Sequence, residues 1–172
     1  GTYKATELYT GIKLTPSNYF MENLSSLLKI NFLKYYGNSI IVAVSNSLLT
    51  VLVCGMCGYA LAKYKFKGSN FFTALVMITM MVPSQLNLVG FVIEMNKIGW
   101  LNTHLPLIIP TAASAFGVFW IKQFTTNAIP DSVLESARID GCGEIGIFFK
   151  IALPFMKPAC MTLILLSFLW SW

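Results

Sequence analysis

A long segment without any charged residue limits what this chain can fold into. Residues 35–62 contain no Asp, Glu, Lys, Arg or His, and Lys34 and Lys63 stand directly at the two ends of the segment. About 20 apolar residues are enough for a helix to cross a bilayer, and a charge at the centre of such a helix costs about 2.5–3.5 kcal/mol. The segment therefore predicts a transmembrane helix with room for tilt.

The rest of the sequence repeats this pattern. Apolar runs cover residues 68–93 and 105–121, and a further run begins near Ala159 and continues to the last residue. Charged residues make up 11 % of the chain, against about 25 % in soluble domains. We therefore predict an all-α membrane protein, a polytopic helical bundle in the lipid bilayer. The net charge is +5, but the basic residues do not form a patch interleaved with aromatic residues, so nucleic-acid binding is not expected.

The polar beginning of the chain divides it into two parts. Residues 1–34 read as an extracellular or periplasmic segment, with a turn at residues 15–17 and a short amphipathic helix within residues 18–28. Residues 35–172 read as the transmembrane domain. The chain opens in a polar stretch and stops inside an apolar run that is too short to span a bilayer. We therefore expect a piece of a longer membrane protein, truncated at both ends.

The lysines predict how the chain is oriented in the membrane. Lys63, Lys65 and Lys67 form the densest positive cluster, and loops rich in lysine and arginine lie in the cytoplasm. Residues 63–69 are therefore predicted to be cytoplasmic in a bacterial cell membrane. Because successive spans alternate in direction, the long connection at residues 122–158 falls on the same side, and the hairpin at residues 94–104 falls on the opposite side.

Polar residues inside the apolar runs are candidates for a substrate path. Pro83 interrupts the second run, and polar side chains near it cannot face lipid cheaply. Two interpretations remain open for this site, a kinked packing helix and a pore-lining break. The residues predicted to line a path are Asn46, Ser84, Gln85 and Asn87.

The cysteines and the single histidine give little support for other chemistry. Cys54 and Cys57 form a CxxC pattern, but it lies within a predicted span and has no histidine or acidic residue near it. Small residues there, with Gly55 and Gly58, favour a close helix–helix contact. His104 lies in a predicted loop without partners for a metal, so no metal site is predicted.

The charged segment at residues 131–154 is the most informative part of the long connection. Ser132 and Glu135 fit an S-x-x-E capping box, which predicts a helix from about residue 133 to residue 140. Gly141 is suited to the left-handed conformation that follows a helix end. A second helix is expected over residues 143–153, ending at Pro154 and followed by a membrane span.

The first of these two helices is short, and isolated helices of this length are marginal in water. It therefore needs a surface to pack on. Val133, Leu134, Ala137 and Ile139 offer apolar area for such packing. Two interpretations are open, an interfacial hairpin that packs only on its own protein, and a helix that fits a groove on a cytoplasmic partner.

The same segment resembles the cytoplasmic loop of ABC importer permeases. The resemblance is carried by Glu135-Ser136-Ala137, by Gly141 after three further residues, and by Ile151-Ala152-Leu153-Pro154 after nine more. Ser136 departs from the pattern, because a second alanine is usual there.

Residues 35–172 are also similar to the carbohydrate-uptake, maltose-permease-like branch of that family. The similar residues are Asn38-Ser39, Tyr59-Ala60-Leu61-Ala62, Phe66 and Gly68, Pro83, Leu101-Asn102-Thr103, Ile129-Pro130 and Ala137-Arg138-Ile139-Asp140-Gly141. Ala115-Phe116-Gly117 departs from the branch, where a proline is frequent.

The resemblance implies a type I ABC importer permease, a transmembrane subunit that forms half of the path for a sugar. Its implied partners are a nucleotide-binding ATPase subunit that holds ATP and Mg²⁺, a second permease subunit and an external solute-binding protein. The residues implied in docking to the ATPase are Ser132, Leu134, Glu135, Ser136, Ala137, Arg138, Asp140, Gly141, Ile151, Leu153 and Pro154. Val133, Leu134 and Ala137 are expected to fill a groove of that ATPase.

The chain itself shows no phosphate-binding G-x-x-x-x-G-K-[ST] motif and no catalytic constellation, so it is not expected to be an enzyme or to bind a cofactor. Other functions remain as alternatives. They are an ABC permease for an amino acid or polyamine, a stand-alone channel or proton-coupled secondary transporter, and an intramembrane enzyme or redox protein built on Cys54 and Cys57. Ion coupling is disfavoured because the spans between residues 35 and 121 carry no ionisable side chain.

Overall fold

The computed structural model describes residues 19–29 and 31–172, except for the side chains of Ser84 and Gln85. The chain divides into two compact units, residues 1–41 and 42–172. The first unit contains helix α1 (Phe20–Lys29), which confirms the expected short amphipathic helix. The turn expected at residues 15–17 lies outside the described residues.

Helix α2 (Phe32–Lys63) confirms the first predicted span and continues across the division between the units. It is unbroken over 32 residues, or about 48 Å at 1.5 Å per residue, which is longer than the roughly 30 Å hydrocarbon core. From Val42 onward one side of α2 is buried in the second unit. That side is formed by small or polar residues, including Ala43, Asn46, Ser47, Thr50, Cys54 and Gly58.

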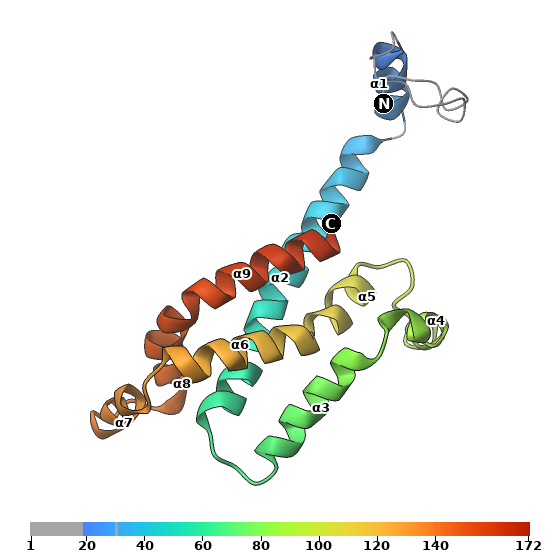
Figure 1. Cartoon of the computed structure of the whole chain (residues 1–172). Helices are drawn as coiled ribbons and strands as arrows, with labels where there is room; N and C mark the ends of the chain where they lie inside the picture. Colours follow the sequence, from blue (N-terminus) through green and yellow to red (C-terminus); the bar gives the residue numbers. More distant parts are fainter. Residues whose placement is uncertain (1–18, 30) are drawn as a thin grey trace, which may run out of the picture. The chain divides into compact units, whose positions relative to one another are not determined.

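The second apolar run is not one helix. Helix α3 (Ser69–Met81) is followed by a 3₁₀ turn η2 (Ser84–Asn87) and by helix α4 (Leu88–Lys97), which lies in a different direction (Figure 1). Pro83 has no N–H to continue a helix, and Val82 before it adopts an extended conformation. Of the two open interpretations, a kinked continuous helix is wrong and a break is observed, while the pore-lining role of this break stays a prediction.

The third apolar run is also interrupted. It consists of helix α5 (Leu105–Ile108), a 3₁₀ turn η3 (Pro110–Ala112) and helix α6 (Ala115–Ala128). The Ser114 side chain accepts a hydrogen bond from the Gly117 N–H and so begins α6. Helix α6 extends seven residues past the predicted end at residue 121, and residues 105–128 together are long and apolar enough to span a membrane.

Most of the predicted connection at residues 122–158 is helical. After α6 come helix α7 (Asp131–Ile139), helix α8 (Glu144–Ile147), a π-helical segment η4 (Phe148–Ala152) and helix α9 (Leu153–Ser171). The expected helix end at Pro154 is wrong, since helix continues through it. The Leu153 N–H bonds to the carbonyl of Phe148, five residues earlier. Pro154 therefore occupies the first turn of α9, where its missing N–H is tolerated.

Helices α2, α6 and α9 form the core of the second unit, and α3 packs against α6. Helices α2 and α6 approach closely, because a Cβ added to Gly58 would lie 2.8 Å from Ile121, and one added to Gly117 would lie 2.8 Å from the Cys54 sulfur. Cys54 is thus part of a helix–helix contact, as the sequence indicated. The Trp120 indole N–H bonds to the Ala159 carbonyl at 3.1 Å and ties α6 to α9.

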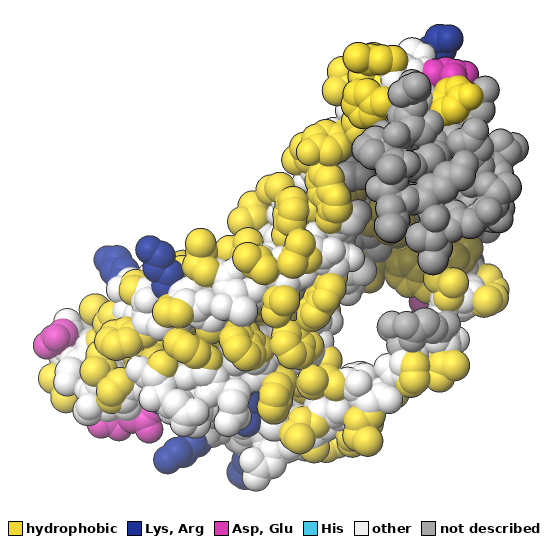
Figure 2. Space-filling model, turned by 45° about the horizontal axis from the view of Figure 1, so that its top comes forward, with side chains coloured by type: hydrophobic (Ala, Val, Ile, Leu, Met, Phe, Trp, Pro, Cys, Tyr) yellow, Lys and Arg dark blue, Asp and Glu magenta, His cyan; other side chains and the backbone are white. Residues whose placement is uncertain are grey.

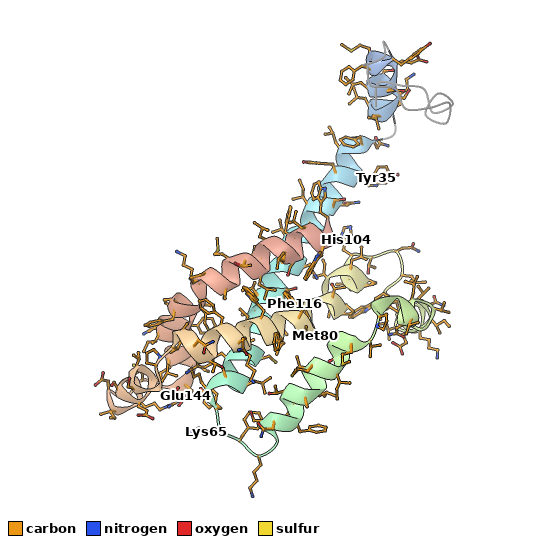
Figure 3. All side chains as sticks on the ribbon, viewed as in Figure 1. Tyr35, Lys65, Met80, His104, Phe116 and Glu144 are labelled. Atoms are coloured by element: carbon orange, nitrogen blue, oxygen red, sulfur yellow. The ribbon has the colours of Figure 1, made fainter. Side chains whose placement is uncertain are left out.

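The outward faces of these helices are apolar. Figure 2 shows hydrophobic side chains over much of the visible surface. On α3 and α9 they include Phe71, Leu75, Ile78, Met81, Phe155, Met161, Leu165 and Leu169. Surfaces of this kind are expected where helices face lipid. Within residues 19–29 and 31–172, three helical stretches are long and apolar enough to span a bilayer. Lys65 and Glu144 lie toward one end of the second unit and His104 toward the other (Figure 3).

Candidate functional site

Helix α7 is the centre of the candidate site, and its beginning differs from the prediction. The helix begins at Asp131 after Pro130, whose extended backbone precedes the first turn. Ser132 therefore lies inside the first turn, and no side-chain cap is formed, so the predicted capping box with Glu135 is wrong. Asp131 at the first position still places a negative charge at the positive end of the helix dipole.

The end of α7 agrees with the prediction for Gly141. Its φ of 83° lies in the left-handed region. The Gly141 N–H bonds to the Arg138 carbonyl and the Cys142 N–H to the Ala137 carbonyl, both at 3.0 Å. These two bonds form the Schellman arrangement that closes a helix end, and they require a left-handed residue at position 141. Gly141 thus turns the chain sharply from α7 toward α8.

The inner face of α7 is buried in the chain's own core. Leu134 is 2 % exposed and Ala137 is buried beside it, in a cluster that includes Ile129, Ile147 and Ala152. This packing disagrees with the expectation that Leu134 and Ala137 fill a groove of another protein. Their apolar area is already used to hold α7 on its own bundle.

The outer face of α7 is open to solvent. Its exposed residues are Ser132, Glu135, Ser136, Arg138, Ile139 and Asp140. Ile139 is 86 % exposed, and the carboxylates of Glu135 and Asp140 make no hydrogen bond or ion pair with any residue that the structure describes. Of the remaining predicted docking residues, Ile151 and Leu153 are half-buried against the core and Pro154 is exposed.

The beginning of α7 is fixed by Lys63, the last residue of α2. The Lys63 ammonium donates to Asp131 Oδ1 at 2.8 Å and to the carbonyl of Ile129 at 2.5 Å. The Lys63 side chain is only 6 % exposed, whereas Asp131 is largely exposed. The hydrogen bond from Lys63 lowers the pKa of the Asp131 carboxyl. This contact also confirms that the lysine loop and the long connection lie at the same end of the bundle.

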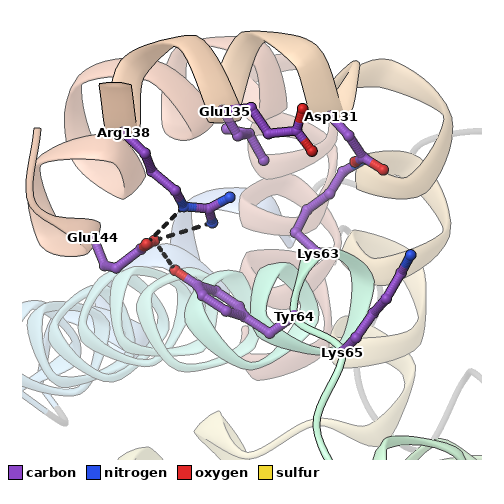
Figure 4. A pocket seen from close by; sticks show the side chains of 8 residues that line it. Lys63, Tyr64, Lys65, Asp131, Glu135, Arg138 and Glu144 are labelled. Atoms are coloured by element: carbon purple, nitrogen blue, oxygen red, sulfur yellow. Dashed lines mark hydrogen bonds and ion pairs between the residues drawn. The ribbon is translucent and has the colours of Figure 1, made fainter. Parts of the chain in front are cut away.

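The end of α7 is fixed by Tyr64, the next residue in the chain (Figure 4). The Tyr64 hydroxyl donates to Glu144 Oε2, and Arg138 donates to both oxygens of the same carboxylate, at 2.7 and 3.3 Å. The Arg138 guanidinium also lies 5.9 Å from the centre of the Tyr64 ring. The bond to Glu144 raises the pKa of Arg138, and burial followed by the bond to Glu144 raises the pKa of Tyr64.

These contacts surround a polar hollow of about 370 Å³ between the end of α2 and α7. Glu135 and Lys65 also line it. The sequence indicated α7 but not the bonds of Lys63 to Asp131 and of Tyr64 to Glu144, because these partners lie 68 and 80 positions away along the chain.

A second polar site lies at the break between α5 and α6. Asn46 is buried, and its amide donates to Thr111 Oγ1 and to the carbonyls of Leu107 and Ile108. Its oxygen accepts from the Ser171 hydroxyl at 2.9 Å. About two turns further along α2, the Cys54 thiol donates to the carbonyls of Ala112 and Ser114. A hollow of about 160 Å³ at this site is lined by Asn46, Thr50, Thr111, Ser114, Ser167, Trp170 and Ser171.

The other residues predicted for the path lie at the break after α3. Ser84, Gln85 and Asn87 belong to η2, and Asn87 is exposed. Asn46 is buried in α2 among partners from α5, η3 and α9, which are different elements. The hydroxyls of Thr111, Ser114 and Ser171 were not predicted, although threonine and serine within an apolar run are a signal that could have found them.

Comparison with known proteins gives a consistent result. Residues 54–172 match the family described as binding-protein-dependent transport system inner membrane component. The arabinooligosaccharides transport system permease protein AraQ of Halalkalibacterium halodurans is 39 % identical over 138 residues, covering 80 % of this chain and 49 % of that protein. The diacetylchitobiose uptake system permease protein NgcG of Streptomyces coelicolor is 31 % identical, covering 99 % of this chain and 58 % of that protein.

A solved structure has the same fold. It is described as a bacterial ABC transporter involved in the import of the acidic polysaccharide alginate, and one of its chains matches with a TM-score of 0.71 at 27 % identity. The match covers 80 % of this chain and 48 % of that chain. The chain likewise spans about half the length of the curated relatives it matches.

Proposed function

Because the chain belongs to the family of inner membrane components of binding-protein-dependent transport systems, we propose that it is part of a carbohydrate ABC importer permease. In this function the helices line one half of a path across the bacterial cell membrane, and α7 connects the path to ATP hydrolysis. The observation that carries the proposal is the exposed outer face of α7, closed by Gly141 and held on the bundle by buried residues.

The outer face of α7 is the proposed docking surface for the ATPase. Glu135 and Asp140 supply carboxylates without partners among the described residues, and Ile139 supplies apolar area. Ser132, Ser136 and Arg138 lie on the same exposed face. Leu134, Ala137, Ile151 and Leu153 contribute indirectly, since they hold the helix in place, and Pro154 begins the span behind it. Docking places residues 63–69 and 122–158 in the cytoplasm.

The proposed partners follow from this arrangement. A separate nucleotide-binding subunit binds ATP and Mg²⁺ and hydrolyses the nucleotide, so this chain contributes no catalytic residue. A second permease subunit forms the other half of the path, and an external solute-binding protein delivers the substrate. Support comes from the family description, which names binding-protein-dependent transport.

The proposed substrate is an oligosaccharide. Relatives are named for arabinooligosaccharides, diacetylchitobiose and lactose, which favours a carbohydrate over an amino acid or polyamine. The hollow at Asn46 is lined by amide, hydroxyl and indole side chains without a charged group, which suits a neutral solute rich in hydroxyls. Asn46 is therefore proposed as part of the path, together with Ser84, Gln85 and Asn87 from the break after α3.

Reconstitution tests this function directly. The complete permease is assembled with its ATPase, second permease and binding protein in proteoliposomes, and uptake of labelled oligosaccharides is followed with and without ATP. We expect uptake that requires ATP and that an excess of amino acids or polyamines does not reduce. Uptake without ATP, or competition by a polyamine, would contradict the proposal.

A further inference from the structure

Two neighbouring residues at the end of α2 hold both ends of α7. Lys63 binds Asp131 and the Ile129 carbonyl at the beginning of the helix. Tyr64 binds Glu144, which is paired with Arg138 at the end of the helix. Helix α7 has nine residues and is about 13 Å long, so fixation at both ends leaves it little freedom to turn on α2 without breaking a bond.

In an ordinary surface ion pair both side chains are exposed, whereas Lys63 and Tyr64 are held by the surrounding residues. The Lys63 side chain is almost fully enclosed and makes two hydrogen bonds. The Tyr64 ring packs edge-on against Tyr59, at 5.7 Å between ring centres, and Tyr59 in turn contacts the Phe148 ring. Lys63 and Tyr64, which we call the anchors of α7, are therefore fixed in place, Lys63 by enclosure of its side chain and Tyr64 by ring contacts with the core.

The same helix also holds the break between α5 and α6. Asn46 and Cys54 bind carbonyl groups within residues 107–114, beside the hollow of about 160 Å³ that Asn46, Thr111 and Ser114 line. Asn46 and Lys63 are 17 positions apart in a helix without interruption, which corresponds to about 25 Å. One rigid helix thus contacts the proposed docking helix at one point and the lining of the proposed path at another.

We propose that Lys63 and Tyr64 are positioning residues that pass a displacement of α7 to α2, and through Asn46 and Cys54 to the break between α5 and α6. This inference rests on the proposed function, because α7 moves only if a partner moves it. In this inference α2 moves as one rigid helix and transmits the motion of α7 to the break between α5 and α6. The coupling runs through named hydrogen bonds, of which the exposed ones, Lys63 to Asp131 and Tyr64 to Glu144, can be removed without changing a fully buried side chain.

Two accessible native cysteines allow the first test. Cys57 on α2 and Cys142 after α7 are exposed, whereas Cys54 and Cys160 are buried. In the assembled importer, with any further accessible cysteine of the complete chain replaced by serine, spin labels on Cys57 and Cys142 report the separation of α2 and α7. We expect the same distance distribution without nucleotide and with bound ATP. A distance that changes between these states would overturn the inference.

Removal of both anchors gives the second test. Tyr64→Phe removes only the hydroxyl, and Asp131→Ala removes the carboxylate that Lys63 binds. In the double variant we expect a broadened distance distribution and a roughly tenfold lower number of solute molecules transported per ATP hydrolysed, with the ATPase still co-purifying. An unchanged transport ratio would overturn the inference, and so would loss of the ATPase, since the anchors would then only build the docking surface.

Control variants remove a hydroxyl and a charge at positions outside these contacts. Tyr35→Phe removes a hydroxyl from the other end of α2, and Lys67→Gln removes a charge from the lysine loop; both side chains are exposed. Neither change should alter the distance or the transport ratio. If the wild-type importer itself shows no ATP-dependent uptake, the proposed function fails, which is a result distinct from an unchanged double variant.

Discussion

Two regions of this molecule hold helix ends with polar side chains, and they use different chemistry. At α7 the holding groups are charged: Lys63 binds Asp131, and Arg138 shares Glu144 with the Tyr64 hydroxyl. At the break between α5 and α6 the groups are neutral, namely the amide of Asn46 and the hydroxyl of Thr111. In both regions side chains donate hydrogen bonds to backbone carbonyls near helix ends, from Lys63 to Ile129 and from Asn46 to Leu107 and Ile108.

The difference follows from the cost of charge in a membrane. A charged side chain in the hydrocarbon region costs several kcal/mol, whereas a neutral amide or hydroxyl that is hydrogen-bonded there costs much less. Charged contacts therefore collect at the end of the bundle that meets water, and neutral ones lie within the spans. The type of polar contact in this chain indicates the environment of each helix end.

The largest expected effect comes from the neutral region. Asn46→Leu removes an NH₂ group that reaches three oxygens and the acceptor for Ser171. Loss of buried partners costs about 1–3 kcal/mol per unsatisfied group, so we expect a destabilisation of about 2–3 kcal/mol, measured as a lower Tm of the complete protein in detergent. The control is Asn87→Leu at an exposed position. Equal Tm values for the two variants would contradict the role given to Asn46.

The next effect concerns the turn after α7. A Cβ on Gly141 meets no atom within 4 Å, but its φ of 83° is unfavourable for residues with a Cβ. Gly141→Val should therefore cost about 1–2 kcal/mol through the backbone alone and displace α7, which reduces transport per ATP hydrolysed. Gly143→Val is the matched control, because Gly143 has a φ of −68° and equally open space. Normal transport by Gly141→Val would contradict the account of α7.

A smaller effect is expected at the Arg138–Glu144 pair. Both side chains are substantially exposed, so solvent and salt screen the pair. Glu144→Gln should lower the Tm less than either change above, and the difference from wild type should shrink as the salt concentration rises. The Asn46→Leu difference should not depend on salt. A salt-dependent effect at Asn46, or a salt-independent one at Glu144, would break the comparison between the two regions.

The smallest effect is a dependence of stability on pH. The bond from Lys63 lowers the pKa of Asp131 in the folded state, so the contribution of this carboxylate is complete above the unfolded pKa of about 3.9. It is lost as the pH falls through the lower folded pKa. The Tm difference between wild type and Asp131→Asn should therefore stay constant from neutral pH down to about pH 5 and disappear only as the pH falls below about 4. A Tm difference that grows as the pH falls would exclude the Lys63–Asp131 contact.

Several parts of this structure could be predicted because their signals are local. The charge-free run predicted α2, and Gly141 predicted the left-handed turn, since each depends on a few adjacent residues. The sequence left a kink and a break at Pro83 both open, because proline permits either one. The extended Val82 and the 3₁₀ turn that follows Pro83 show a break. The predicted capping box is wrong because α7 begins directly after Pro130, two residues before the predicted start at residue 133.

Contacts between distant residues could not be predicted. The amphipathic pattern of α7 offered apolar side chains on two sides, and it did not indicate that Leu134 would pack inward while Ile139 pointed out. The Lys63–Asp131 and Tyr64–Glu144 contacts depend on how α2, α7 and α8 pack together. The lysine cluster indicated a side of the membrane but gave no sign that one of its members anchors a helix.

The central claim is that the outer face of α7 meets an ATPase subunit, and cross-linking tests it most directly. A photoreactive amino acid replaces Ile139, which is 86 % exposed on α7, and in a control replaces Ile98, which is 53 % exposed after α4. The complete protein is irradiated in membranes that contain the whole transport system. The account predicts an adduct between position 139 and the nucleotide-binding subunit, and none from position 98. Absence of this adduct from position 139, with the system assembled, would contradict it.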